Sequence, residues 1–247
     1  MQGVTIRVLG CGDAFGSGGR FQSCYLVNAG PDRFLIDCGA TVLVAMRRQG
    51  VDPNLISTVF LSHLHGDHFG GLPFLLLDAH YASGRTQPLT VAGPPGTGRN
   101  LDRLLEVCFA GANGLKWNFP LHIVELAARQ SRKVNGVEVT AIPVVHSAGT
   151  PSYGLRLACA GKVIGYSGDT EWTDSLCDIA RGADLLIVEC YGYAPGTSYH
   201  LDYQTLKSHW DELDARRRLL THMGPAMLDR LDSVDCETAE DGLLIEL

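Results

Sequence analysis

Apolar residues along the chain follow two periodicities, one typical of β-strands and one typical of α-helices. Short runs that alternate with polar residues, or are continuously apolar between turn residues, predict strands. These predicted strands lie at 4–9, 23–28, 33–37, 56–61, 130–134, 137–143, 153–158, 162–167, 184–189 and 218–221. Helices are predicted from 39 to about 49, through 101–108, near 173–180 and near 202–214. Strands followed by helices occur twice, which predicts an α/β fold with two sheets face to face and helices outside.

The composition is that of a folded globular protein, and nothing in it divides the chain. Apolar residues make up 45% of the 247 residues and charged residues 19%, which is ordinary for a globular protein. No Ser/Pro-rich linker, charge block or short repeat separates one part from another. We therefore predict one domain over residues 1–247.

Charge, hydropathy and cysteine placement disfavour several functional classes. The net charge of −7 argues against large nucleic acids, whose binding draws on clustered lysine and arginine. The longest apolar stretch, Leu72 to Leu77, is too short to cross a membrane. The N-terminus lacks the pattern of an export signal, and the eight cysteines are scattered singly, as expected in a reducing compartment. These features predict a cytoplasmic protein without a membrane partner.

The segment from Gly93 to Asn100 imitates a nucleotide-binding P-loop. Arg99 stands at the position of the phosphate-binding lysine, and Asn100 stands at the position of the Mg²⁺-binding Ser or Thr. Because both groups that hold the nucleotide are absent, we predict only a turn from a strand into a helix at this point.

One stretch carries an unusual density of metal-binding side chains. It is Ser62-His63-Leu64-His65-Gly66-Asp67-His68, which follows the apolar run 56–61. We place it in the turn between a buried strand and a helix. Imidazole and carboxylate groups are ligands that Zn²⁺ and Mn²⁺ accept. A catalytic zinc takes about three protein ligands, so four candidates here, with more further on, predict two adjacent ions.

The pattern H-x-H-x-D-H in this stretch resembles the first motif of the metallo-β-lactamase superfamily, and it matches at every named position. The resemblance implies that the chain folds as a four-layer αββα sandwich. It also implies that the metal ions lie at one edge of the molecule, between the two sheets.

Three further candidate ligands follow apolar runs later in the chain. They are His146, Asp169 and His222. Each one alone is weak support, because a histidine at a strand end is more often structural and an aspartate before threonine is more often a helix cap. Their order of His, Asp and His is that of the superfamily, and this recurrence makes them candidates as a group.

The resemblance implies a role for each of these side chains. The implied ligands are His63, His65 and His146 for one ion, Asp67, His68 and His222 for the other, and Asp169 as the bridge between them. A hydroxide shared by the two ions would be available near neutral pH, because each metal lowers the pKa of bound water. The residue types leave Zn²⁺ and Mn²⁺ both open.

Glu189 and His200 point to one branch of the superfamily. Glu189 ends the buried run 184–189, and His200 lies just before the predicted helix near 202–214. The pair resembles the ribonuclease Z-like branch, in which such a Glu and His act near the scissile phosphate. A cationic imidazole there could neutralise phosphate charge or protonate the leaving alkoxide. The alternative stays open that His200 only neighbours a helix cap and that Glu189 is only capping or salt-bridged.

The spacing between two of the implied ligands bears on the substrate. Relatives that process tRNA insert a long basic arm between the equivalents of His146 and Asp169, whereas only the 22 residues 147–168 lie between them here. The chain also resembles the phosphonate-pathway cyclic phosphodiesterases, without their N-terminal cysteine-rich zinc site. We therefore expect a small-molecule phosphodiester substrate and no large nucleic acid.

These observations predict a dinuclear metal-dependent hydrolase, most specifically a phosphodiesterase acting on a small or cyclic nucleotide-like diester through a metal-bridging hydroxide. Asp67 would hold a metal and help to position the water, and His200, supported by Glu189, would stabilise the transition state or leaving group. One alternative keeps the metals but changes the substrate to a thioester, lactone or β-lactam. Another is a non-catalytic metal-binding partner protein. A homodimer is the default expectation for a soluble oligomer.

Overall fold

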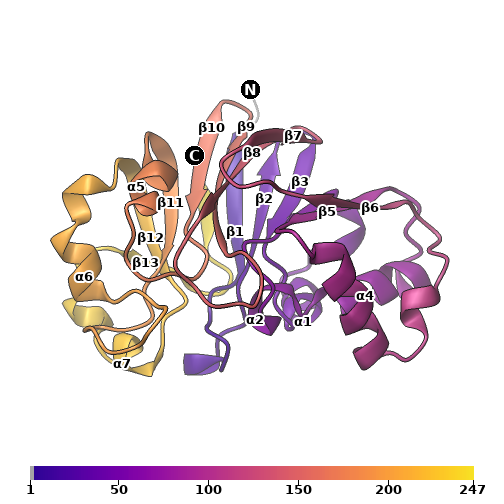
Figure 1. Ribbon diagram of the computed structural model, residues 1–247, viewed down its shortest axis with the longest axis horizontal. Coiled ribbons are helices and arrows are strands. Elements are labelled where there is room, and N and C mark those ends of the chain that lie inside the picture. The colour runs from indigo at the N-terminus through magenta and orange to yellow at the C-terminus, as the bar shows by residue number, and fades with distance from the viewer. Residues whose placement is uncertain (1–2) are drawn as a thin grey trace.

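Two seven-stranded β-sheets pack face to face in the computed structural model, which describes residues 3–247, and helices cover the outer face of each sheet (Figure 1). The predicted four-layer αββα sandwich is therefore confirmed. Met1 and Gln2, which the predicted domain of residues 1–247 includes, lie outside the described residues. Within residues 3–247, no helix has the length and apolar character that a membrane-spanning helix needs.

The first sheet is formed mainly by the N-terminal half of the chain. Its strands are β1 (Val4–Gly10), β2 (Cys24–Ala29), β3 (Asp32–Ile36), β4 (Thr58–Phe60), β5 (Leu89–Gly93), β6 (Leu121–Glu125) and β14 (Leu244–Glu246). They are arranged in the order β14-β1-β2-β3-β4-β5-β6. The strands from β14 to β3 pair antiparallel, whereas those from β3 to β6 pair parallel.

The second sheet has the same design. Its strands are β7 (Ser131–Val134), β8 (Val137–Pro143), β9 (Tyr153–Cys159), β10 (Lys162–Tyr166), β11 (Ala183–Glu189), β12 (Ala215–Thr221) and β13 (Glu237–Thr238). They are arranged in the order β13-β12-β11-β10-β9-β8-β7. The strands from β7 to β10 pair antiparallel and those from β10 to β13 pair parallel.

The helices divide into two groups, one for each sheet. The first sheet carries α1 (Val42–Arg48), α2 (Gly66–Phe69), α3 (Leu72–Leu77) and α4 (Thr97–Cys108), and the second carries α5 (Ser175–Ala180), α6 (Tyr203–Ser208) and α7 (Pro225–Leu228). Figure 1 shows α4 outside the first sheet and α6 outside the second, at opposite ends of the molecule. The turn predicted between 93 and 100 is confirmed, since β5 ends and α4 begins there.

Side chains that alternate along the strands build three apolar layers. In β3, Phe34 and Ile36 pack between the two sheets, whereas Leu35 packs under the helices of the first sheet. In β11, Ile187 faces the inner layer and Val188 faces α5 and α6. A parallel strand covered on both faces has to be apolar throughout, which explains why these segments have nearly continuous apolar sequences.

Some elements differ from the sequence-based expectation. The helix predicted from residue 39 begins at Val42, and the helix predicted over 202–214 ends at Ser208 and is followed by a short 3₁₀ helix at Trp210–Glu212. The strands β6, β13 and β14 were not predicted. Each lies at the edge of a sheet, where most of its side chains are not buried, so its sequence has no clear apolar pattern.

The arrangement of strands determines where functional side chains meet. The parallel strands β3, β4 and β5 of one sheet, and β10, β11 and β12 of the other, end at a common edge of the sandwich, near α2 (Figure 1). The carboxyl ends of parallel strands are where α/β proteins place their ligand sites. The predicted site residues all follow strands that end at this edge or lie in the loops beside it.

Candidate metal centre

The H-x-H-x-D-H motif spans a loop and a helix. His63 and His65 lie in the loop after β4, whereas Asp67 and His68 lie in the single turn of α2. The predicted position in a turn between a buried strand and a helix is therefore confirmed for His63 and His65, whereas Asp67 and His68 already belong to the helix. Because α2 has turned the chain, the four side chains fall into two groups rather than one.

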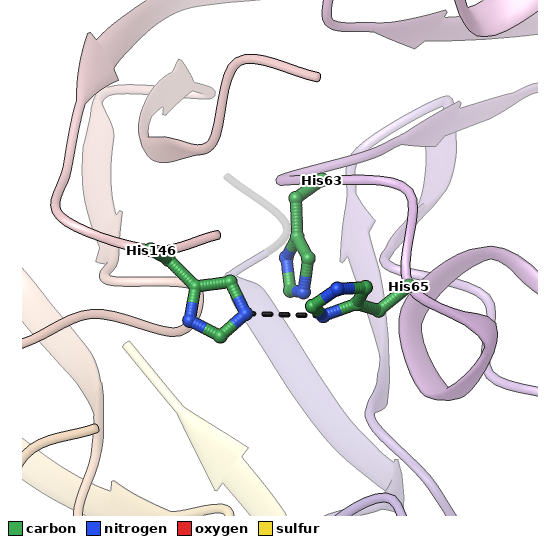
Figure 2. A group of neighbouring side chains, drawn as sticks. All are labelled: His63, His65 and His146. Carbon is green, nitrogen blue, oxygen red and sulfur yellow. Dashed lines mark hydrogen bonds between the residues drawn. The ribbon is translucent and has the colours of Figure 1, made fainter. Parts of the chain in front are cut away.

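The first group consists of His63, His65 and His146, and Figure 2 shows the three rings facing one another. The Nε2 atom of His146 lies 3.0 Å from Nδ1 of His65. The buried Nε2 atom of His63 has no hydrogen-bond partner within residues 3–247. Ligand atoms around a tetrahedral zinc ion are about 3.3 Å apart, because each bond is about 2.0–2.1 Å long. The spacing of this group therefore fits a divalent cation.

The second group consists of Asp67, His68, Asp169 and His222, all of which are buried. Nε2 of His68 lies 3.3 Å from Nε2 of His222 and 3.3 Å from Oδ2 of Asp67. Nε2 of His222 lies 3.2 Å from the same Asp67 oxygen. Three side chains thus direct one atom each to a common point, and the set of two imidazoles and carboxylate oxygens suits Zn²⁺ and Mn²⁺ equally.

Asp169 lies between the two groups. Its Oδ2 atom is 3.8 Å from Nε2 of His63 and 3.8 Å from Nε2 of His146, while its Oδ1 atom is 3.2 Å from Nε2 of His68. The buried Oδ1 atom has no hydrogen bond in the described part of the chain. The structure therefore brings all seven predicted ligands together, with one carboxylate facing both groups.

The two groups differ in their electrostatics. Burial lowers the pKa of His63 well below its ordinary value, and the neighbouring His68 adds to this effect. For His68, burial also favours the neutral ring, but the charges of Asp169 and Asp67 outweigh it and raise the pKa well above its ordinary value. The pKa of His222 is raised for the same reason, against burial and mainly by Asp169. Without a metal, His68 and His222 therefore retain their protons to higher pH than His63 does.

Asp37 supports the second group and was not among the predicted site residues. Its carboxylate lies 2.6 Å from Nδ1 of His68, and it accepts hydrogen bonds from the backbone and hydroxyl of Ser62 and from the hydroxyl of Tyr166. A partner on Nδ1 leaves Nε2 of His68 free to bind a metal. Asp37 directly follows the apolar strand β3, so the same strand-end signal that revealed Asp169 also marks Asp37.

Glu189 and His200 are in contact beside the cluster. Nδ1 of His200 lies 3.0 Å from Oε2 of the buried Glu189, whose other oxygen accepts a hydrogen bond from the backbone N–H of Thr170. Burial raises the pKa of Glu189 well above its ordinary value, and the charge of Asp169 adds to this rise. The N-cap of α6 is Asp202, two residues after His200.

The cluster opens into a cleft of about 360 Å³. His65, His146, His200 and other cluster residues line it, and so do Ala14, Phe15, Tyr191, Thr197 and Ser198. Phe15 belongs to the glycine-rich loop after β1, lines the cleft and is 83% exposed. Phe15 and Tyr191 were missed because single aromatic residues carry no positional signal.

Three histidines do not join the cluster. Nδ1 of His80 accepts a hydrogen bond from the backbone N–H of Asn118, and His209 stacks on Trp172 with ring centroids 3.9 Å apart. His122 is exposed on the edge strand β6. All three therefore have structural or surface positions away from the cluster.

Comparisons with known proteins relate this cluster to a family. The profile of the family described as Anti-Pycsar protein Apyc1 matches residues 4–238. The protein named Ribonuclease Z from Mycobacterium bovis (strain BCG / Pasteur 1173P2) is 32% identical over 193 residues, which cover 74% of this chain and 69% of that protein. The family profile spans the residues that form the cluster and the cleft.

Solved structures agree on the fold. The metallo-β-lactamase fold protein YhfI from Bacillus subtilis has a TM-score of 0.78 at 23% identity, and the alignment covers 99% of this chain and 100% of that one. Human tRNase Z, short form, has a TM-score of 0.77 at 24% identity and 98% coverage of both chains. The chain belongs to the Anti-Pycsar protein Apyc1 family and is a metallo-β-lactamase-fold hydrolase with ribonuclease Z relatives.

Proposed function

We propose that this protein is a dinuclear metal-dependent phosphodiesterase that acts on a small or cyclic nucleotide-like diester. The observation that carries the proposal is the position of His200, which lines the same cleft as the His/Asp cluster and contacts the buried Glu189 behind it. A proton donor supported in this way suits the alkoxide that leaves a phosphodiester. The names of the ribonuclease Z relatives also refer to cleavage of a phosphodiester, the linkage of RNA.

The two groups of side chains would each hold one divalent ion, either Zn²⁺ or Mn²⁺. The first ion would bind His63, His65 and His146, the second would bind Asp67, His68 and His222, and Asp169 would bind both. The orphaned Nε2 atom of His63 and the orphaned Oδ1 atom of Asp169 support this assignment, because buried polar atoms normally have a partner. Such ions lower the pKa of bound water and withdraw charge from a phosphoryl oxygen.

Asp67 has a second task in this proposal. Burial by itself would raise its pKa, but the charge of His68 and hydrogen bonds from His222 and His68 lower the pKa below its ordinary range. Asp67 is therefore ionised at neutral pH, and its carboxylate can accept a hydrogen bond from the attacking water. This contact would orient the water toward phosphorus.

His200 would serve the leaving group. Its Nδ1 atom contacts Glu189, which leaves Nε2 as the ring nitrogen that can face the substrate. A proton on Nε2 would pass to the leaving oxygen as the phosphorus–oxygen bond breaks, and the imidazolium would stabilise the charged transition state before that. Glu189 would keep the ring in this orientation and tautomer.

The local chain supports a small substrate. The 22 residues between His146 and Asp169 include β9 and β10, which pair directly through a tight turn at Ala160 and Gly161. This hairpin belongs to the second sheet, and residues 147–168 contain no projecting arm. The cleft of about 360 Å³ is in the range of pockets for small molecules, about 300–1,000 Å³.

The proposal is tested by supplying purified protein, reconstituted with Zn²⁺ or with Mn²⁺, with an aryl phosphodiester, a thioester and a lactone in parallel. We expect metal-dependent cleavage of the phosphodiester alone. Cleavage of only the thioester or lactone would show that the substrate is a carbonyl compound and not a phosphodiester. Two bound metals without cleavage of any of the three would favour a binding protein.

Single substitutions distinguish the role of His200 from that of the candidate metal ligands. His200→Ala should lower kcat for the phosphodiester about 10²–10⁴-fold without loss of metal, which is the usual contribution of a positioned acid. His63→Ala should lose metal as well as activity. His122→Ala, an exposed histidine on β6, is the matched control and should keep both. Unchanged turnover in His200→Ala would remove the role assigned to that side chain.

A further inference from the structure

His222 lacks the support that two other candidate ligands have on their second ring nitrogen. Nδ1 of His68 contacts Asp37, and Nδ1 of His146 contacts a backbone carbonyl. The Nδ1 atom of His222 is buried and has no hydrogen-bond partner in the described part of the chain, while its Nε2 atom faces Asp67. A metal-binding ring usually takes its orientation from a partner on the other nitrogen. The ring of His222 is therefore oriented in a different way.

The backbone of His222 is held by the glycine-rich loop after β1. His222 has a φ of +57°, a left-handed conformation that is rare for a residue with a large side chain. Its backbone N–H donates a 3.0 Å hydrogen bond to the carbonyl of Cys11, and the hydroxyl of Thr221 donates a 3.3 Å hydrogen bond to the same carbonyl. A strained backbone persists only where tertiary contacts hold it, so the position of Cys11 controls the direction of the His222 ring.

Asp241 joins the two ends of that loop. Its Oδ1 atom accepts a 3.1 Å hydrogen bond from the backbone N–H of Cys11 and a 3.3 Å hydrogen bond from the Cys11 thiol. Its Oδ2 atom accepts a 2.7 Å hydrogen bond from the backbone N–H of Phe21. The backbone N–H of Gly12 also donates to the carbonyl of Phe21, at 2.7 Å, which closes the loop upon itself. One carboxylate from near the C-terminus thus fixes the residue on which His222 rests.

We propose that Asp241 is a positioning residue for the second metal ion, because it fixes Cys11, and Cys11 fixes the backbone of the ligand His222. This inference rests on the proposed function, since it takes His222 as a ligand of that ion. Asp241 is not one of the clustered side chains and acts on the cluster through the loop. The segment between β13 and β14 thereby gains a task at the metal centre.

The experiment measures metal affinity, so that it does not depend on turnover. Zn²⁺ is titrated into the metal-free protein in competition with a chromophoric chelator, which gives one dissociation constant for each of two ions. His63→Ala and His222→Ala, which each remove a ligand of one group, assign the two constants. We expect Asp241→Ala to raise the dissociation constant of the second ion about tenfold, as for other groups behind a ligand, and to leave that of the first ion within about twofold.

Two further variants distinguish positioning from a general loss of structure. Asp241→Asn keeps one oxygen that can accept a hydrogen bond from the loop, so it should weaken the second ion only about threefold. This milder variant carries the test by itself if Asp241→Ala does not fold, which urea unfolding shows. Glu240→Ala removes the neighbouring exposed carboxylate and is the matched control, with both constants expected within about twofold of the unmodified protein.

Combined variants test whether Asp241 acts through His222. In the His222→Ala background, addition of Asp241→Ala should leave metal affinity unchanged, whereas in the His63→Ala background it should still weaken the second ion. Equal weakening of both ions by Asp241→Ala would overturn the proposal, because a structural disturbance would then explain the loss. A further loss in the His222→Ala background would also overturn it, as would an unchanged second constant in both Asp241 variants.

Hydrolysis of an aryl phosphodiester, measured on the same samples after metal reconstitution, separates this inference from the proposed function. Two bound ions, the second of which depends on Asp241, without any diester cleavage would keep the positioning role and reject the phosphodiesterase. Diester cleavage together with a second constant that neither Asp241 variant changes would keep the phosphodiesterase and reject the positioning role. An unmodified protein that binds no second ion would overturn both.

Discussion

The backbone carbonyl oxygen of Tyr199 lies 2.9 Å from Nδ1 of His146. A carbonyl oxygen can only accept a hydrogen bond, so Nδ1 carries the proton and Nε2 is left free for the cluster. Tyr199 has a φ of +66°, a left-handed conformation that is rare for a residue with a bulky side chain. Its own N–H donates a 2.6 Å hydrogen bond to Oε1 of Glu171. Glu171 thus stabilises a strained residue that in turn orients a candidate ligand.

The first prediction concerns Glu171. Replacement by alanine removes the acceptor for Tyr199 N–H, so the loop relaxes, and we expect metal affinity to fall about tenfold, as for other groups behind a ligand. Glu171→Gln keeps a side-chain oxygen at the same position and should stay within about threefold of the unmodified protein. Competition with a chelator measures both. Equal losses in the two variants would show that charge, and not the hydrogen bond to Tyr199, is what matters.

The second prediction concerns Asp37, whose carboxylate contacts His68, Ser62 and Tyr166 inside the protein. Asp37→Ala leaves these buried groups without their partner, and we expect a loss of about 3 kcal/mol in the free energy of unfolding. Metal affinity should fall about 10–100-fold. The φ of Asp37 is +57°, which asparagine tolerates, so Asp37→Asn isolates the loss of charge from backbone strain. Urea unfolding and chelator competition give the two quantities.

The Asp37→Asn variant shows whether the contact between Asp37 and His68 serves to orient the ring. If Asp37 mainly orients His68, Asp37→Asn should bind metal more tightly than Asp37→Ala, because an oxygen can still accept the hydrogen bond from the ring. Metal affinity equal to that of the unmodified protein in both variants would contradict the supporting role of Asp37.

The cluster could be predicted because several of its residues come just after apolar runs, which can be recognised in the sequence. Asp169 and His222 come just after apolar runs, and such runs become parallel strands whose carboxyl ends meet at one edge. The edge strand β14 could not be found in this way. It has three residues, and its pairing with β1 joins segments at opposite ends of the chain.

The supporting contacts could not be predicted for a different reason. Glu171 accepts a hydrogen bond from the backbone N–H of Tyr199, and the backbone carbonyl of Tyr199 contacts His146. Every non-proline residue has a backbone N–H and a carbonyl, so the sequence cannot show which residue will form these contacts. The left-handed conformations of Asp37, Tyr199 and His222 are likewise invisible in an apolar pattern. These strained residues cluster around the candidate metal centre, where tertiary contacts and not local preference fix the backbone.

The third prediction concerns Gly168, which precedes the candidate bridging ligand Asp169. It has a φ of +59°, and a Cβ atom there would come within 2.8 Å of the carbonyl oxygen of Tyr153. Gly182 has a nearly equal φ of +60°, but a Cβ atom added to it would have no neighbour within 4 Å among residues 3–247, so Gly182→Ala is a matched control for backbone strain. We expect Gly182→Ala to cost about 1 kcal/mol of unfolding free energy and Gly168→Ala clearly more, about 3 kcal/mol. Equal losses of unfolding free energy in the two variants, measured by urea unfolding, would mean that the residues packed around Gly168 can move to make room for a Cβ atom.

The last prediction links metal binding to pH. In the metal-free protein the pKa values of His68 and His222 are raised, against burial and mainly by Asp169, while burial lowers those of His63 and His146. A metal ion can bind an imidazole only after its proton has left, so His68 and His222 must release protons, whereas the lowered pKa values of His63 and His146 favour rings that are already neutral. Metal affinity should therefore rise with pH above about 6.5, the ordinary pKa of histidine.

The folding stability of the metal-free protein should fall as pH rises, whereas the metal affinity should rise. A raised pKa means that the protonated His68 stabilises the fold fully below about pH 6.5, and this contribution is lost as pH rises through the folded-state value. Removal of metal by a chelator should therefore lower Tm more at about pH 8 than at about pH 6, on either side of the ordinary histidine pKa. Thermal scans at the two pH values measure this difference, and calorimetric titration in buffers of different ionisation enthalpy counts the released protons. A metal affinity that does not change with pH, together with no proton release, would mean that His68 and His222 are neutral before the metal binds.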